Sequence, residues 1–140
     1  MSLDKIQDEL QEIAEAIMSV VGLDVTIIDK TTKRLAGTGK YRPMIGSFAP
    51  KHSVFEQSIR SGRQYVVKEP RICNECKGCQ GRESCSEEAE ICYPIETDKG
   101  IAGVIGMIAF SRGQKSAFLA KEKQYMHFVS RMSKLISARM

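Results

Sequence analysis

Apolar residues recur at intervals of three or four along the first twenty positions of the chain. This spacing places them on a single stripe of a helix, made of Leu3, Ile6, Leu10, Ile13, Ile17 and Val20. Gly22 is well placed to end that helix. The β-branched residues 25–29 then predict a strand, and residues 34–37 are expected to return beside it after a polar turn.

The middle of the chain alternates between an irregular segment and short regular elements. Residues 38–51 contain glycines, two prolines and few apolar side chains, so we expect a long loop of the kind that borders a ligand pocket. Residues 52–61 show helical spacing closed by Gly62, and residues 64–67 predict a third strand. A cysteine-rich insert over residues 70–92 follows this strand.

The last third of the chain predicts a hairpin and then a helix. Residues 91–96 are strand-like, residues 97–100 have turn chemistry, and residues 101–111 form a long, nearly uncharged segment expected at the centre of the sheet. Residues 114–140 carry a broad apolar face at helical spacing and predict one long terminal helix.

This order of elements predicts a single α+β domain over residues 1–140. We expect an antiparallel sheet of about five strands, with the N- and C-terminal helices packed mainly on one of its faces. The apolar surface of the two terminal helices also predicts a homodimer. The terminal helix reaches the last residue without a stop signal, so we expect the domain to be part of a larger protein.

Composition excludes several classes of function. The net charge of the 140 residues is +4, and the basic residues are scattered, so direct nucleic-acid binding by this domain is not expected. The longest apolar run is about half the length needed to span a bilayer. No export signal is evident, and the predicted compartment is the cytoplasm, without membrane attachment.

All five cysteines lie within the insert, at positions 73, 76, 79, 85 and 92. A clustered, odd set in a reducing compartment favours metal binding over a disulfide framework. Thiolates are soft donors, which indicates zinc or an iron-sulfur cluster rather than magnesium or calcium. The compact CxxCxxC run is typical of ferredoxins and favours a cluster, whereas zinc ribbons use two separated CxxC pairs.

Three functions are consistent with these observations. The first is a sensory module that passes a redox or small-ligand signal through its terminal helix. The second is a structural zinc-binding dimerisation module, and the third is a thiol redox protein. Neither His52 nor His127 lies in a motif with a positioned carboxylate or nucleophile, so no catalytic residue is predicted and the chain is not expected to be an enzyme.

The chain resembles the GAF/PAS-like N-terminal sensory domains of clostridial-type sigma-54-dependent transcriptional regulators. The resemblance rests on residues 25–29, 34–39 and 52–62, and above all on the CxxC pair and the Cys92-Tyr-Pro-Ile segment. It implies a GAF-like or PAS-like fold and a downstream effector domain in the parent chain. It further implies that the metal ligands are Cys76, Cys79, Cys85 and Cys92, with Cys73 as an alternative ligand. The small-molecule ligand is unknown.

Overall fold

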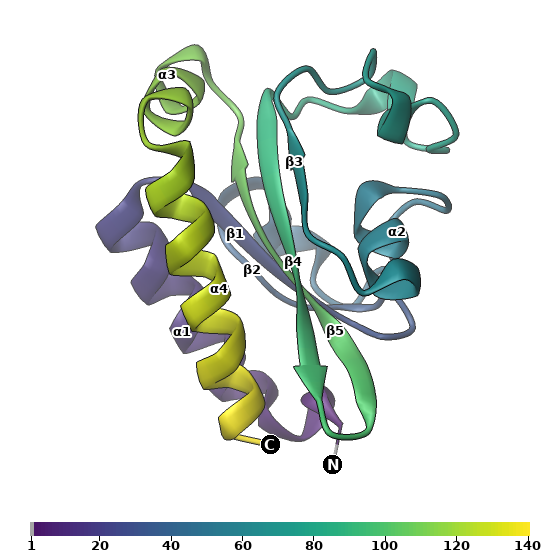
Figure 1. Cartoon of the computed structure of the whole chain (residues 1–140), viewed down its shortest axis with the longest axis vertical. Coiled ribbons are helices and arrows are strands. Elements are labelled where there is room, and N and C mark those ends of the chain that lie inside the picture. The colour runs from purple at the N-terminus through teal and green to yellow at the C-terminus, as the bar shows by residue number, and fades with distance from the viewer. Residues whose placement is uncertain (1) are drawn as a thin grey trace.

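A computed structural model describes residues 2–140 of the chain as one antiparallel sheet with helices on both faces (Figure 1). The sheet order is β2-β1-β5-β4-β3. The strands are β1 (Asp24–Asp29), β2 (Arg34–Gly37), β3 (Tyr65–Val67), β4 (Ala89–Thr97) and β5 (Gly100–Ala109). The longest strand, β5, lies at the centre, so the predicted five-stranded α+β architecture is confirmed.

The α-helices separate into two groups. One face of the sheet is covered by α1, α3 and α4, and the other by α2 (Figure 1). Their bounds are α1 (Gln7–Val21), α2 (Val54–Ser61), α3 (Arg112–Ala120) and α4 (Glu122–Ala138). The terminal helices therefore share one face, as predicted, and the short α2 lies opposite them. Within residues 2–140, no helix combines the length and apolar character needed to cross a bilayer.

Local sequence signals explain where α1 and α2 end. Gly22 has φ +80° and donates its N–H to the Met18 oxygen, and Gly62 has φ +69° and donates to the Ser58 oxygen. A residue with a side chain is strained in this left-handed conformation, so glycine is favoured at both ends. The Ser53 hydroxyl accepts a hydrogen bond from the Glu56 N–H and caps the start of α2.

The expected single helix over residues 114–140 is wrong, because the chain leaves the helical conformation at Lys121 (φ −130°, ψ 29°) and forms α3 and α4. The two helices are fixed to different parts of the sheet. The Gln114 side chain accepts from the Phe110 N–H and donates to the Gly22 oxygen, which holds α3 at the end of β5. Hydroxyls of α4 instead bond to carbonyls of β4, and one straight helix could not satisfy both attachments.

The second face of the sheet carries a smaller apolar core beneath α2. It contains Ile28, Tyr41, Ala49, Val54, Phe55, Val67, Cys92, Val104 and Ile108. Gly106 belongs to the floor of this layer, since a Cβ there would lie 2.7 Å from Cε1 of Phe55. The absence of a side chain at this position lets the Phe55 ring rest on β5.

Candidate functional site

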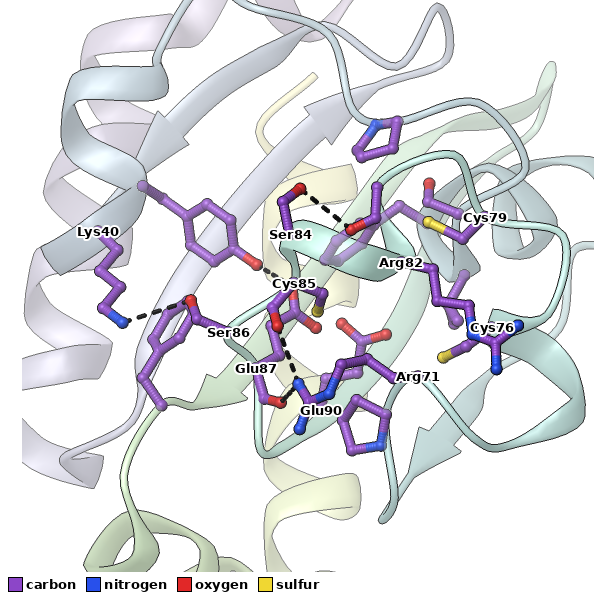
Figure 2. A pocket seen from close by; sticks show the side chains of 18 of the residues that line it. Lys40, Arg71, Cys76, Cys79, Arg82, Ser84, Cys85, Ser86, Glu87 and Glu90 are labelled. Carbon is purple, nitrogen blue, oxygen red and sulfur yellow. Dashed lines mark hydrogen bonds between the residues drawn. The ribbon is translucent and has the colours of Figure 1, made fainter.

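A cavity of about 200 Å³ opens on the second face of the sheet. Its walls come from three segments that are distant in sequence: the loop over residues 38–51, α2, and the cysteine-rich segment over residues 70–87 (Figure 2). The first of these contains the 3₁₀ helix η2 (Gly39–Met44), which carries Tyr41 into the wall. The expectation that this loop borders a pocket is confirmed.

The cysteine-rich segment forms the roof of the cavity and is attached to its neighbours by hydrogen bonds. The Gln80 N–H donates to the Lys51 oxygen at 3.0 Å, and the Gln57 side chain on α2 donates to the Glu75 oxygen at 2.6 Å. Gly81 lies against Pro50, where a Cβ would meet the proline ring at 2.7 Å. The roof therefore packs against both α2 and the loop over residues 38–51.

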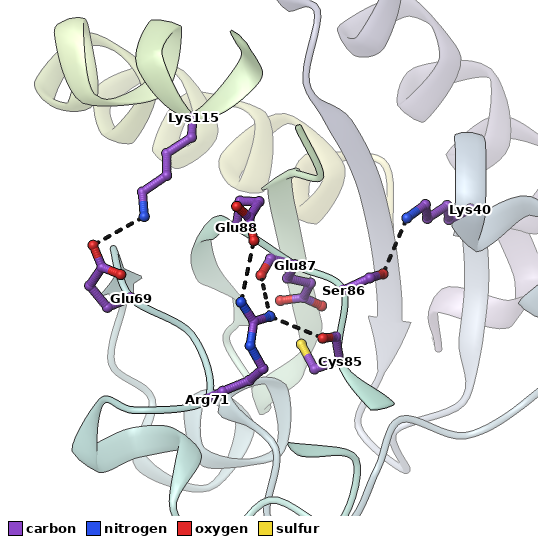
Figure 3. A network of polar contacts seen from close by, with 8 residues as sticks. All are labelled: Lys40, Glu69, Arg71, Cys85, Ser86, Glu87, Glu88 and Lys115. Atoms are coloured by element: carbon purple, nitrogen blue, oxygen red, sulfur yellow. Dashed lines mark hydrogen bonds and ion pairs between the residues drawn. The ribbon is translucent and has the colours of Figure 1, made fainter. Parts of the chain in front are cut away.

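Arg71 holds the second half of the roof in place. One guanidinium nitrogen donates to the Cys85 oxygen at 3.0 Å and to the Glu87 oxygen at 2.8 Å, and the other lies 3.3 Å from the Glu88 carboxylate (Figure 3). Its backbone has φ +74°, a left-handed conformation that is uncommon for residues other than glycine. Sequence reasoning did not identify Arg71, because two of its three partners are backbone carbonyls and all three lie 14 to 17 positions away.

Arg34 on β2 is a buried cation in the cavity wall. Its side chain is 1% exposed, its Nε donates to the Thr26 hydroxyl at 2.8 Å, and its guanidinium lies 4.5 Å from the centre of the Tyr41 ring. Its Nη1 atom has no partner in the described part of the chain. Burial lowers the pKa of Arg34, although a guanidinium remains charged at neutral pH.

Two acidic residues also line the cavity. The Tyr41 hydroxyl donates to the Glu87 carboxylate, and Glu90 on β4 is 3% exposed with its Oε2 atom unpartnered among residues 2–140. Burial raises the pKa of Tyr41 well above its ordinary value. Burial, and then the negative charge of Glu87, likewise raises the pKa of Glu90. The cavity is therefore lined by both a buried cation and carboxyl groups.

The structure brings four of the five cysteines to the roof and leaves one in the core. Cys76, Cys79 and Cys85 line the cavity, and Cys73 donates its thiol hydrogen to the Cys76 sulfur at 3.1 Å. Cys92 is fully buried in β4. Burial, and then the hydrogen bond shared with Cys73, raises the pKa of Cys76 to about 12, and burial also raises the pKa of the Cys79, Cys85 and Cys92 thiols.

The cysteine thiols are suited chemically to a soft metal, but their arrangement in this structure is not that of a metal site. Zinc–sulfur bonds of about 2.3 Å in a tetrahedron place ligand sulfurs roughly 3.8 Å apart, whereas the Cys73 and Cys76 sulfurs are closer. Among the described residues, no three cysteine, histidine or acidic side chains are arranged to hold one ion. The assignment of Cys76, Cys79, Cys85 and Cys92 as ligands, with Cys73 as the alternative, therefore stays a prediction.

Solved structures with the same arrangement of elements identify the fold. The chain aligns with the nlh2 GAF domain of A. aeolicus in an inactive state with a TM-score of 0.68, covering 97% of this chain and 89% of that one at 12% identity. The fold is that of a GAF domain. A free methionine-R-sulfoxide reductase from Thermoplasma acidophilum matches this GAF fold equally well, with a TM-score of 0.68 and 14% identity over 98% and 94% of the two chains.

One curated protein is similar over nearly the whole chain. It is UacR of Escherichia coli (strain K12), a sigma-54-dependent transcriptional regulator whose name refers to uric acid, and it is 27% identical over 139 residues. These residues are 99% of this chain and 24% of UacR, so the chain spans about a quarter of the relative's length. No protein-family model matches the chain.

The charged residues of the cavity were not predicted as site residues. Arg34 and Glu90 each lie in a strand whose other residues are mostly buried. A charged residue inside an otherwise apolar strand is uncommon unless it has a partner or a function, and this signal could have identified both positions. The meeting of Tyr41 with Glu87 has no sequence signal, because the two residues are 46 positions apart.

Proposed function

We propose that this GAF domain is the sensory part of a larger sigma-54-dependent transcriptional regulator. The observation that carries the proposal is the cavity beneath the cysteine-rich roof, which is lined by buried side chains with unpartnered polar atoms. The similarity to UacR supports this assignment, because it extends over the whole sensory fold and leaves three-quarters of UacR for other parts. The domain would act as a sensor in the cytoplasm and would not catalyse a reaction. Contact with DNA would be made by the output part of the parent chain.

We further propose that Cys76, Cys79 and Cys85 of the roof, together with Cys92 of β4, hold an iron-sulfur cluster or a zinc ion, with Cys73 as the alternative ligand. Four soft donors within twenty residues support this assignment. A bound metal would draw the thiols together and fix the roof over the cavity. A cluster would add sensitivity to oxidants, whereas zinc would act only as a structural staple.

A thiol redox role is the second candidate, and the contact between the Cys73 and Cys76 sulfurs favours it. Two thiols at 3.1 Å need to move only about 1 Å to reach the S–S bond length of a disulfide. In this alternative, the loss of two hydrogens to a low-molecular-weight disulfide would join the two sulfurs and alter the roof.

The signal would leave the domain through α4. Ser133 and Ser137 of α4 bond to carbonyl oxygens of β4, the strand that also carries Glu90 and Cys92.

Exposed apolar residues of the two terminal helices, Val20 and Leu135 among them, support pairing of two copies through α1 and α4. Sedimentation of the protein at micromolar concentration tests this pairing, and a single-chain mass would contradict it.

Metal analysis of anaerobically purified protein tests the metal proposal. Iron with sulfide and visible absorption supports a cluster, and one zinc per chain without colour supports a staple. The matched comparison is a variant with Cys76 and Cys79 changed to serine, which should lose the metal. Protein that contains neither metal and keeps its fold would contradict metal binding.

Uric acid, which appears in the relative's name, is the first small molecule to test for binding to the cavity.

A further inference from the structure

A second hollow on the surface lies between the turn that joins β1 to β2 and helix α2. This groove has a volume of about 500 Å³, and it shares no lining residue with the cavity beneath the roof. Ala49 and Ile59 line it with apolar side chains, and the Phe48 side chain beside them is 62% exposed. An exposed aromatic ring at an apolar groove is typical of a protein interface.

Positively charged side chains surround the groove. Lys30, Lys51 and Arg60 line it, and Lys33 lies opposite Phe48 in an isolated β-bridge, so these two side chains emerge on the same side. All four cationic residues are exposed. The three lysines make no ion pair within residues 2–140. A partner that approaches the groove therefore meets an excess of positive charge.

The carboxylates nearest to the groove are already engaged. One oxygen of Asp29 accepts hydrogen bonds from the Thr31 N–H, the Thr31 hydroxyl and the Lys33 N–H within the turn. A carboxylate oxygen of Glu56 lies 3.0 Å from a guanidinium nitrogen of Arg60. Neither carboxylate is free to neutralise the lysines, so the lysine ammonium groups are available to a partner.

The backbone at the groove adopts an uncommon conformation at two places. Thr32 has φ +72° and His52 has φ +63°, which is the left-handed region that residues other than glycine rarely occupy. Thr32 lines the groove and accepts the Ala49 N–H at its backbone oxygen at 2.9 Å, and His52 directly follows Lys51. Strained backbone of this kind is concentrated at functional sites, which supports a preformed binding surface.

The groove shares a segment of chain with the cysteine-rich roof. The backbone oxygen of Lys51 accepts the Gln80 N–H at 3.0 Å, and the neighbouring Pro50 ring lies against Gly81. A partner held in the groove would therefore contact a segment that the roof also contacts.

We propose that this groove docks an acidic segment of a partner protein, with one apolar side chain beside Phe48 and carboxylates paired with Lys30, Lys33 and Lys51. The apolar side chain covers the Phe48 ring and the groove floor, and the carboxylates supply the complementary charge that steers association. A nucleic acid fits this site less well, because its phosphates would leave the apolar floor uncovered and the cations surround one groove instead of forming a stripe.

Selection from a random peptide library displayed on phage tests this assignment, with the whole chain as the target. Bound peptides are expected to share aspartate or glutamate residues around an aromatic or aliphatic residue. The affinity of a selected peptide, measured by calorimetry, should fall as the salt concentration rises, since ion pairs at a surface are screened by salt. A selection that yields basic peptides, or peptides of no shared composition, would overturn the proposal.

Two variants of the groove separate its apolar and charged contributions. Phe48→Ala should weaken binding of the selected peptide about tenfold or more, because it removes the aromatic anchor. The double change Lys30→Glu and Lys51→Glu should also weaken it about tenfold or more, because repulsion replaces attraction. Normal peptide binding by either folded variant would overturn the proposal.

Matched controls change the same kinds of residue on α3 and α4. Leu119→Ala shortens another exposed apolar side chain, and the double change Lys123→Glu and Lys134→Glu alters the net charge by the same amount as the lysine variant of the groove. Both controls should bind the peptide as the unaltered chain does. A thermal melt checks that each variant is folded, which is expected because every changed residue is exposed.

A DNA duplex of mixed sequence distinguishes the two classes of acidic partner. Tighter binding of the duplex than of the selected peptide, with loss of that binding in the lysine variant of the groove, would overturn the assignment to a protein. The docking surface goes beyond the sensory function and does not require the metal or a small molecule. Its failure would therefore leave the sensory proposal and its own tests unaffected.

Discussion

Ser133 on α4 donates its hydroxyl hydrogen to the backbone oxygen of Pro94 on β4 at 2.7 Å. Ser137, one turn later, makes the same kind of bond to the Glu96 oxygen, also at 2.7 Å. The opposite face of this strand carries Glu90 into the cavity. A shift of β4 caused by a ligand would therefore act directly on the position of α4.

Substituting Ser133 by alanine should weaken this attachment. Ser133 is buried, so its loss leaves the Pro94 oxygen without its partner, and we expect the free energy of unfolding to fall by about 1–2 kcal/mol. Urea unfolding measures this change. Ser137→Ala is the matched control, because the exposed Ser137 bond can be replaced by water and should cost less than about 0.5 kcal/mol. Equal effects of the two variants would contradict a special role for the buried bond.

Gly106→Ala should damage the cavity floor. The added methyl group would lie 2.7 Å from the Phe55 ring, so the ring and α2 must move, at a cost of about 1–3 kcal/mol. Thermal melting and ligand titration should both show a loss. Gly113→Ala, in the first turn of α3, would meet only the Ser111 hydroxyl oxygen, at 4.0 Å, and should leave the stability unchanged or raise it by less than about 1 kcal/mol. A neutral Gly106→Ala variant would show that the floor is not tightly packed.

Arg71→Gln should loosen the roof while sparing the sheet. The change removes the cation that links the carbonyls of Cys85 and Glu87 to the Glu88 carboxylate. We expect faster protease cleavage within residues 71–88 and weaker ligand binding. Arg82→Gln, on the same roof, has no ion pair among the described residues and serves as the control for the cleavage rate. The same cleavage rate in both variants would contradict the role given to Arg71.

Alkylation of metal-free protein should be slow at neutral pH. The thiolate is the reactive form, and the pKa of Cys76 is raised to about 12 while burial also raises the pKa of Cys92. The modification rate of Cys76 should increase about tenfold for each pH unit between 7 and 9, since the thiolate fraction rises in that proportion. Cys92 should be modified only after unfolding.

Mass spectrometry of peptides after timed treatment with iodoacetamide measures both rates. Protein unfolded in urea is the control, in which all five thiols should react at similar rates. Rapid and equal modification of Cys76 and Cys92 in the folded protein at pH 7 would contradict the burial of these thiols.

Much of the fold follows from the local sequence. The stripe of α1, the Ser53 cap, the glycines that end α1 and α2, and the turn between β4 and β5 depend on residues close together in the chain, so periodicity and capping rules predict them. The clustered cysteines are equally a property of the sequence, and they indicate soft-metal chemistry without specifying which sulfurs approach one another. The resemblance to sensory domains likewise predicts the GAF fold that the structure has.

Only the tertiary structure determines the cavity and the break at Lys121. Arg34 and Glu90 are 56 positions apart in the sequence. They line one cavity because the strand order places β2 and β4 in the same sheet, with β1 and β5 between them. The break between α3 and α4 arises because Gln114 bonds to one end of the sheet and Ser133 to another strand. Such long-range contacts depend on strand order and on the burial of unpaired charge, and neither is encoded in the spacing of neighbouring residues.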